Sequence, residues 1–223
     1  MDIPHIPVLL DEVLSFILPI ETGCVLDATT GFASHSFEIL NKTNLSLLCN
    51  DKDIEALEFS KNRLANFDSK VSFINKSFSN LKDELHTFGI KAVLADIGVL
   101  SYQLDNKERG FSFLSENIDM RMDRTSSLDA KYVVNNYSKE ELETIFKDYG
   151  EVSDYKKMAS VICDYRKDKD IESSKELAEL IAKHTRRFSK INPATLVFQA
   201  IRIEVNSELE ELKTLLANIA QAN

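Results

Sequence analysis

Short apolar runs alternate with helix-like segments along the first hundred residues of the chain. The runs at 23–28, 45–49, 71–74 and 92–95 have the length and apolar composition of buried strands. Helical spacing fills the stretches between them, and Asp53 is placed to cap one of these helices. Strands that alternate with helices imply right-handed crossovers and a parallel sheet. The pattern therefore predicts an α/β fold of the doubly wound kind.

The pattern changes after Leu104. From Ser138 onward the spacing predicts only amphipathic helices, and capping boxes begin two of them, at Ser138 and Ser173. One long helix is predicted over 193–223, where apolar residues keep helical spacing. We therefore expect three parts, which are an α/β domain over 1–106, a helical domain inserted over 107–192, and a long helix over 193–223 that leads back toward the sheet.

Composition and charge narrow the class of protein. Hydrophobic residues at 43% and charged residues at 28% exclude wholesale disorder. The three cysteines are far apart and form no C-x-x-C pair, which disfavours a zinc site or a disulfide framework and favours a reducing compartment. No apolar run approaches the roughly 20 residues of a membrane span, so we expect a cytoplasmic protein.

The net charge of −9 argues against a protein that binds bare nucleic acid with its whole surface. A local basic patch is still compatible with this charge, since net charge averages over all faces. The best patch is Lys183–Arg187 together with Lys190. An exposed helix end explains these residues equally well.

Polar residues follow the predicted strands at the edge where ligands bind in open α/β sheets. The turn at 27–36 contains small residues, so its backbone N–H groups can approach a ligand. Asp51 lies 20 residues after Gly31, where an acidic side chain accepts hydrogen bonds from ribose hydroxyls. Asp96 ends the fourth strand. An ordinary turn and loop capping are the alternatives, but together the three features favour an adenosine-containing ligand.

Other residues allow two interpretations each. His35 could act as a general base, although a histidine in a turn is more often a structural hydrogen-bonding residue. The segments 109–113 and 119–123 could stack on a nucleobase and place Arg109 on a phosphate. The interpretation that we favour is packing of the helical part onto the sheet by Phe111, Phe113, Met120 and Met122.

Taken in order, these segments resemble the MraW/RsmH family of S-adenosylmethionine-dependent methyltransferases, which act on the ribosomal RNA of the small subunit. The resemblance runs from about His5 to the last residue. Six ordered blocks carry it, and they are 5–13, 27–36, 96–105, 109–113, 119–123 and 192–209.

The resemblance implies a Rossmann-like class I methyltransferase sheet with an inserted all-helical domain. It also implies methyl transfer from S-adenosylmethionine to the N4 amino group of a cytidine in the decoding centre of 16S rRNA, within the small subunit. Asp96 is our candidate for the catalytic group. The cofactor contacts that carry over are Ala33, Ser34, His35, Asp51, Phe78, Asp96 and Gln103.

The sequence departs from the family at three places. Phe32-Ala33-Ser34 replaces a run of glycines, and we expect the added Cβ atoms to crowd the turn and to remove access to positive φ. Leu100-Ser-Tyr-Gln103 stands where relatives have Ser-Ser-Pro-Gln. The family also continues into further strands, so we expect a truncated copy whose last sheet strands are absent.

The truncation has consequences that we state as expectations. The apolar strand at 92–95 would be left at an edge of the sheet, and an unpaired edge is a template for another chain. We therefore expect self-association and weak methylation by the isolated chain. The alternatives are a non-catalytic remnant that binds the ribosome or a partner through its helical part, and a nicotinamide-dependent oxidoreductase. The glycine-poor turn and the helical insert disfavour the oxidoreductase.

Overall fold

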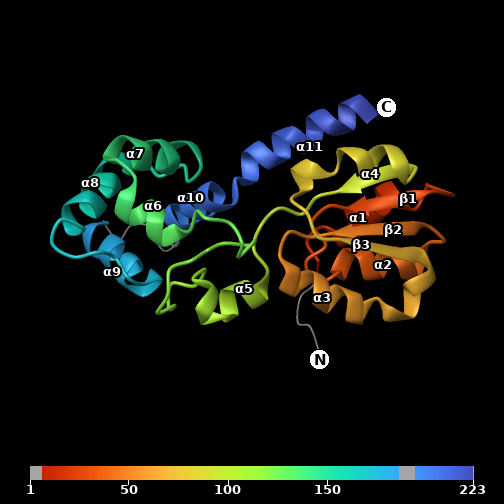
Figure 1. Ribbon diagram of the computed structural model, residues 1–223, viewed down its shortest axis with the longest axis horizontal. Helices are drawn as coiled ribbons and strands as arrows, with labels where there is room; N and C mark the ends of the chain where they lie inside the picture. The colour runs from red at the N-terminus through yellow and green to blue at the C-terminus, as the bar shows by residue number, and fades with distance from the viewer. Residues whose placement is uncertain (1–6, 186–193, 223) are drawn as a thin grey trace. The chain divides into compact units, whose positions relative to one another are not determined.

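A computed structural model describes residues 7–185 and 194–222 (Figure 1). The chain divides into two compact units. The first contains residues 1–100 and 209–223, and the second contains residues 101–208. The first unit is therefore built from the beginning and the end of the chain.

The first unit is built on four strands, β1 (Cys24–Asp27), β2 (Ser46–Asn50), β3 (Val71–Ile74) and β4 (Ile90–Leu94). Their order in the sheet is β3-β2-β1-β4, and each neighbouring pair is parallel. The predicted doubly wound α/β fold is therefore confirmed. All four residues of β1 are buried, whereas those of β4 are half-buried or exposed, as expected of an edge strand.

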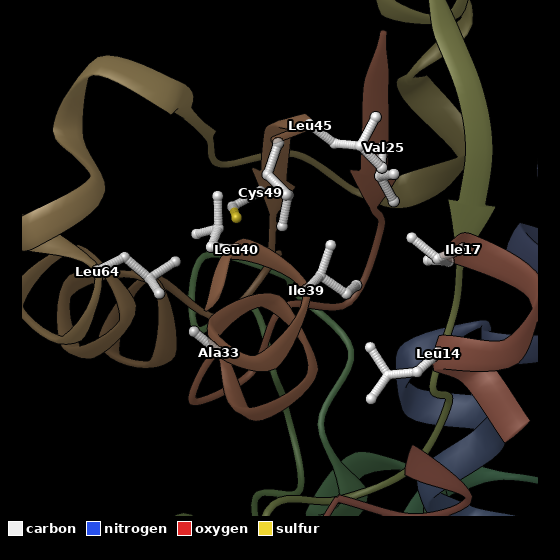
Figure 2. Packing of buried hydrophobic residues seen from close by; sticks show 10 residues of the cluster. Leu14, Ile17, Val25, Ala33, Ile39, Leu40, Leu45, Cys49 and Leu64 are labelled. Carbon is white, nitrogen blue, oxygen red and sulfur yellow. The ribbon is translucent and has the colours of Figure 1, made fainter. Parts of the chain in front are cut away.

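One face of the sheet packs against two helices, α1 (Leu10–Ile17) and α2 (Ser34–Lys42). Figure 2 shows how their side chains gather around Val25 of β1 and Cys49 of β2. The buried set is completed by Leu14, Ile17, Ala33, Ile39, Leu40, Leu45, Leu47 and Leu64.

The other face packs against α4 (Lys82–Thr87) and α11 (Glu208–Ala222). Leu26 and Leu48 point to this side because side chains alternate along a strand. They meet Leu81 before α4 and Leu215 of α11. The last helix of the chain thus contributes to the core of the first unit.

The remaining elements of the first unit connect the strands. They are α3 (Ile54–Arg63) and two short 3-10 helices, η1 (Ala65–Lys70) and η2 (Phe78–Asn80). Asp53 caps α3 as predicted, because its side chain accepts a hydrogen bond of 3.1 Å from the backbone N–H of Glu55.

The described part of the second unit is helical. It contains α5 (Ser101–Asp105), η3 (Lys107–Arg109), α6 (Ala130–Asn136), α7 (Lys139–Asp148), α8 (Tyr155–Tyr165), α9 (Ser174–His184) and α10 (Ala194–Asn206). The capping box at Ser138 is present. At Ser173 only half of the predicted box forms, because the Glu176 carboxylate accepts instead from the backbone N–H of Glu172.

The prediction of one long helix over 193–223 is wrong in the described residues, because the helix breaks at Ser207. This residue has a φ of 51°, which ends α10 and begins α11 one residue later. The Asn206 side chain donates to the carbonyls of Met120 and Arg202, and it accepts from the backbone N–H of Met122. These contacts hold the end of α10 against a loop 80 and more residues earlier, which helical spacing alone does not reveal.

Among the described residues, no helix has both the length and the apolar character that crossing a membrane requires.

Candidate functional site

The turn after β1 and the end of β2 are joined by Asp51. Its Oδ2 accepts a hydrogen bond of 2.8 Å from the backbone N–H of Gly31, and its Oδ1 accepts one of 2.9 Å from the backbone N–H of Asp53. Desolvation raises the pKa of Asp51 to about 6, against the two N–H groups, which lower it. The Asp51 carboxylate thus connects the C-terminal ends of the neighbouring strands β1 and β2.

Glycine is favoured at position 31 of this turn. Its φ is 53°, and a Cβ on it would lie 2.6 Å from Cδ2 of Leu100. Ser60 of α3 donates a hydrogen bond of 2.5 Å to the carbonyl oxygen of Gly31. The turn is therefore fixed from both sides of Gly31.

Asp27 at the end of β1 is a buried acid that holds the turn. Its side chain is 2% exposed and accepts a hydrogen bond of 2.6 Å from the Ser36 hydroxyl. Burial raises the pKa of Asp27 to about 6, against the hydrogen bond from Ser36, which lowers it. Sequence reasoning placed Asp27 in the motif but did not single it out, because only the structure shows that its carboxylate points inward.

Ala33 adopts a backbone conformation that the sequence analysis did not expect of a residue other than glycine. Ala33 adopts a φ of 56° although it is not glycine, and it precedes the first residue of α2. Neither Phe32 nor Ser34 has a positive φ. The expectation that side chains here remove access to positive φ is therefore wrong at Ala33.

Arg63 of α3 supports the same turn. Its guanidinium donates to the carbonyl of Phe32 at 2.9 Å and to the hydroxyl of Ser34 at 3.1 Å. The Phe32 ring lies 4.4 Å from that of Phe59, centroid to centroid. The side chains that replace glycine have thus acquired contacts of their own.

His35 and Asp96 lie close together beside this turn. His35 Nδ1 is 3.9 Å from Oδ2 of Asp96, and Nε2 is 2.9 Å from the carbonyl oxygen of Val8. A carbonyl only accepts, so Nε2 carries a hydrogen and, in the neutral ring, Nδ1 is the lone-pair nitrogen. Thr29 accepts a hydrogen bond of 2.7 Å from the Asp96 backbone N–H, which ties the end of β4 to the turn.

Asp96 differs from the other two acids in its exposure. Its side chain is 48% exposed, so a ligand or substrate can reach the carboxylate. Asp27 and Asp51 are engaged by the protein's own N–H and hydroxyl groups, whereas Asp96 projects its carboxylate toward solvent beside His35. Of the three, Asp96 is the acid best placed to exchange a proton with a substrate.

Phe78 begins η2, after the end of β3, and is 4% exposed. The Nζ atom of Lys52 lies 5.9 Å from the centre of its ring. Asn50 joins the same region to β1, since its side chain donates to the carbonyls of Ala28 and Lys76. Sequence reasoning missed Asn50, although its position directly before Asp51 was a usable signal.

Gln103 lies outside the first unit, which contains the other predicted cofactor contacts. It belongs to α5 of the second unit, where it is buried. The residues that the structure brings together are therefore Ala33, Ser34, His35, Asp51, Phe78 and Asp96.

The arginine and aromatic segments of the second unit have a packing role. Arg109 is 2% exposed and donates hydrogen bonds to the carbonyls of Arg121 and Met122. Phe111 and Met120 are also buried. These residues are buried, which leaves Arg109 with no surface to offer a phosphate.

The basic patch falls largely outside the described residues, because Arg186, Arg187 and Lys190 lie there. Within the described ranges, no group of three or more His, Cys, Asp or Glu side chains is arranged to hold a metal ion.

Comparison with known proteins identifies the family. The family model of the MraW methylase family matches residues 2–222. A protein of Aliarcobacter butzleri named ribosomal RNA small subunit methyltransferase H is 52% identical over 223 residues, which are 100% of this chain and 73% of that protein. Proteins of the same name from Nautilia profundicola and Campylobacter jejuni are 51% and 47% identical, over 97% and 98% of this chain and 70% and 71% of their own lengths. The chain therefore belongs to the MraW methylase family.

Proposed function

We propose that this chain binds S-adenosylmethionine and transfers its methyl group to the N4 amino group of a cytidine in the decoding centre of 16S rRNA, within the small ribosomal subunit. Family membership and the name of the relatives support methyl transfer to small-subunit rRNA. The assignment of a cytidine as the target, of its N4 atom as the methylated position and of S-adenosylmethionine as the cofactor rests on the resemblance of the site residues.

The observation that carries the cofactor proposal is the carboxylate of Asp51 between the turn and the end of β2. A carboxylate offers about four acceptor sites, and two are used by Gly31 and Asp53. Two remain for the hydroxyl groups of a ribose. Phe78, which begins η2 after the adjacent strand β3, supplies a ring on which a purine base can stack.

The remaining cofactor contacts are assigned in the same way. Ala33 precedes α2 and its backbone N–H donates to the carbonyl of Thr30, whereas Ser34 and His35 lie in the first turn of α2, where backbone N–H groups have no partner within the helix and can meet a ligand carboxylate. Gln103 is assigned by the resemblance alone. S-Adenosylmethionine, when bound, supplies an electrophilic methyl group on a sulfonium.

We assign to Asp96 the task of orienting the cytosine amino group. The lone pair of this nitrogen is delocalised into the ring, which makes the nitrogen a weak nucleophile. The amino group therefore needs a neighbour that accepts a hydrogen bond from its N–H and takes up the proton when the nitrogen bonds to the methyl group. The exposed carboxylate of Asp96 can do both. The lone pair of His35 Nδ1, 3.9 Å away, offers that proton a second acceptor.

A methyl-transfer assay tests the proposal. Small subunits that lack the modification are incubated with the chain and with S-adenosylmethionine labelled on the methyl group, and the rRNA is digested to nucleosides. We expect label in N4-methylcytidine, and we expect loss of label with Asp96→Asn. The matched control is Asp83→Asn, an exposed acid in the first turn of α4.

Two results would contradict the proposal. Label in another nucleoside would exclude the assigned target. Binding of the cofactor without any transfer would favour the non-catalytic alternative.

A further inference from the structure

An ion pair connects the proposed cofactor site to the last helix of the chain. Nζ of Lys52 lies 2.8 Å from Oε1 of Glu211, which is 159 residues later in the sequence. The side chains are 11% and 15% exposed, so the pair is largely withdrawn from solvent. Lys52 directly follows Asp51, to which we assign the ribose.

The same helix is held against the residues around Phe78. Asn218 of α11 donates a hydrogen bond of 3.0 Å to the carbonyl oxygen of Ser79. Leu215 packs in one apolar cluster with Phe78. Glu211, Leu215 and Asn218 lie on one face of α11 because they are separated by four and three residues. This face of α11 therefore borders the ring that we assign to the base.

One oxygen of Glu211 has no hydrogen-bond partner in the part of the chain that the structure describes. Oε2 is buried, and within the described residues it makes no hydrogen bond. Native proteins satisfy most buried polar atoms, and a charged oxygen left without a donor is costly. A ligand that brings a donor to this oxygen would recover part of that cost.

We infer that Glu211 selects the base of the ligand, with Oε2 accepting a hydrogen bond from the exocyclic amino group of an adenine that stacks on Phe78. The inference rests on the proposed function, since it assumes an adenosine cofactor at Asp51. The ammonium of Lys52 now lies 5.9 Å from the centre of that ring, so a base that stacks there requires the ammonium to move off the ring face while it stays within reach of Oε1.

A carboxylate discriminates between amino and oxo groups on a purine. It accepts from the 6-amino group of adenine, whereas the 6-oxo group of hypoxanthine offers it only another acceptor. The pair of probes is therefore S-adenosylhomocysteine and S-inosylhomocysteine, which differ at this position of the base. The wild-type chain is expected to prefer the adenine form.

The decisive variant is Glu211→Gln. The Lys52 ammonium has only donors, so it will hold the carbonyl oxygen of the glutamine and turn its NH2 group toward the base. The NH2 group matches an oxo group and opposes an amino group. We expect the ratio of the two dissociation constants, measured by calorimetry, to shift by roughly ten-fold or more in favour of the inosine form.

Asn218→Ala is the matched control, because it loosens the same helix without touching Glu211. It is expected to weaken both ligands alike, so that their ratio stays at the wild-type value. An unchanged ratio in a folded Glu211→Gln variant would overturn the inference, whether or not both affinities fall. A wild-type chain that binds neither probe would overturn the cofactor proposal, and the inference with it.

Discussion

The backbone N–H of Gly31 and the carboxylate of Asp51, 20 residues apart, are joined by a hydrogen bond of 2.8 Å. This bond fixes the turn after β1 against the end of β2 before any ligand arrives. Asp51 therefore has a structural role as well as the proposed role in binding, and experiments must separate the two.

Replacing Asp51 with alanine is expected to weaken binding of S-adenosylhomocysteine by about 1.5–3 kcal/mol, the scale of a hydrogen bond to a charged group. Thermal stability falls as well, because two backbone N–H groups lose their acceptor. Calorimetry and thermal unfolding give the two effects separately. Asp53→Ala is the control, since it removes the cap of α3, worth about 1 kcal/mol, with the ligand affinity preserved. Equal losses of affinity in both variants would show that Asp51 has a structural role only.

Stability is expected to fall as the pH rises from 5 to 7. Asp27 and Asp51 have pKa values of about 6 in the folded chain, above the ordinary 3.8. Each acid therefore binds its proton more tightly in the folded chain than in the unfolded chain. Its contribution to the free energy of unfolding is complete below about pH 4 and is lost as the pH passes 6. Between pH 5 and 7 the buried Asp27 costs on the order of 1 kcal/mol.

Urea unfolding at the two pH values, followed by circular dichroism, measures this fall, and Asp27→Asn should reduce it. Glu176, whose pKa lies at about 2, acts in the opposite sense. Its contribution is lost only below about pH 4.5, outside the window used. A free energy of unfolding that rises from pH 5 to 7 would contradict the assignment of raised pKa values to these acids.

Ala33→Gly is expected to change stability by less than about 1 kcal/mol. Glycine relieves the positive φ of 56°, at a gain of about 1 kcal/mol, but it removes a buried methyl group and frees the unfolded chain. The Ala33 methyl group packs in the apolar cluster of Figure 2, so its loss should leave the affinity for S-adenosylhomocysteine unchanged.

Phe32→Gly provides the contrast, since it loses the contact with Phe59 and is expected to cost roughly 2–4 kcal/mol. Ligand binding that tightens ten-fold in Ala33→Gly would show instead that crowding limits the site.

The outer edge of β4 is expected to support self-association. The Leu94 carbonyl bonds to the backbone N–H of Ala28 in the continuation of β1, so the N–H groups of Val93 and Ala95 face away from the sheet. No strand in the described residues pairs with that side. Sedimentation should show a concentration-dependent species, and the two amides should exchange more slowly as it forms. A monomer at all concentrations, with both amides protected, would contradict this expectation.

The presence and parallel direction of the four strands could be predicted because the strands are short, apolar and separated by helices, whereas their order in the sheet was not predicted. Asp51 after β2 and Asp96 after β4 could be predicted for a related reason, since the carboxyl ends of parallel strands meet at one edge. The burial of Phe111 and Met120 was also recognisable from the sequence, whereas their packing onto the sheet stays a prediction.

What the sequence does not reveal depends on contacts between distant residues. The break at Ser207 follows from the side chain of Asn206, which bonds to a loop far back in the chain. The pair of Lys52 and Glu211 spans 159 residues, and periodicity carries no information on which face of a helix meets which turn. Ala33 adopts a backbone conformation that its residue type disfavours, and only the surrounding fold imposes it.

Calorimetric titration of the wild-type chain with S-adenosylhomocysteine, and in parallel with NAD, tests the proposed function most directly. The predicted result is saturable one-to-one binding of S-adenosylhomocysteine, weakened in Asp51→Ala, with no heat of binding from NAD. Binding of NAD in preference to S-adenosylhomocysteine, or binding of neither by a folded chain, would contradict the assignment of the site.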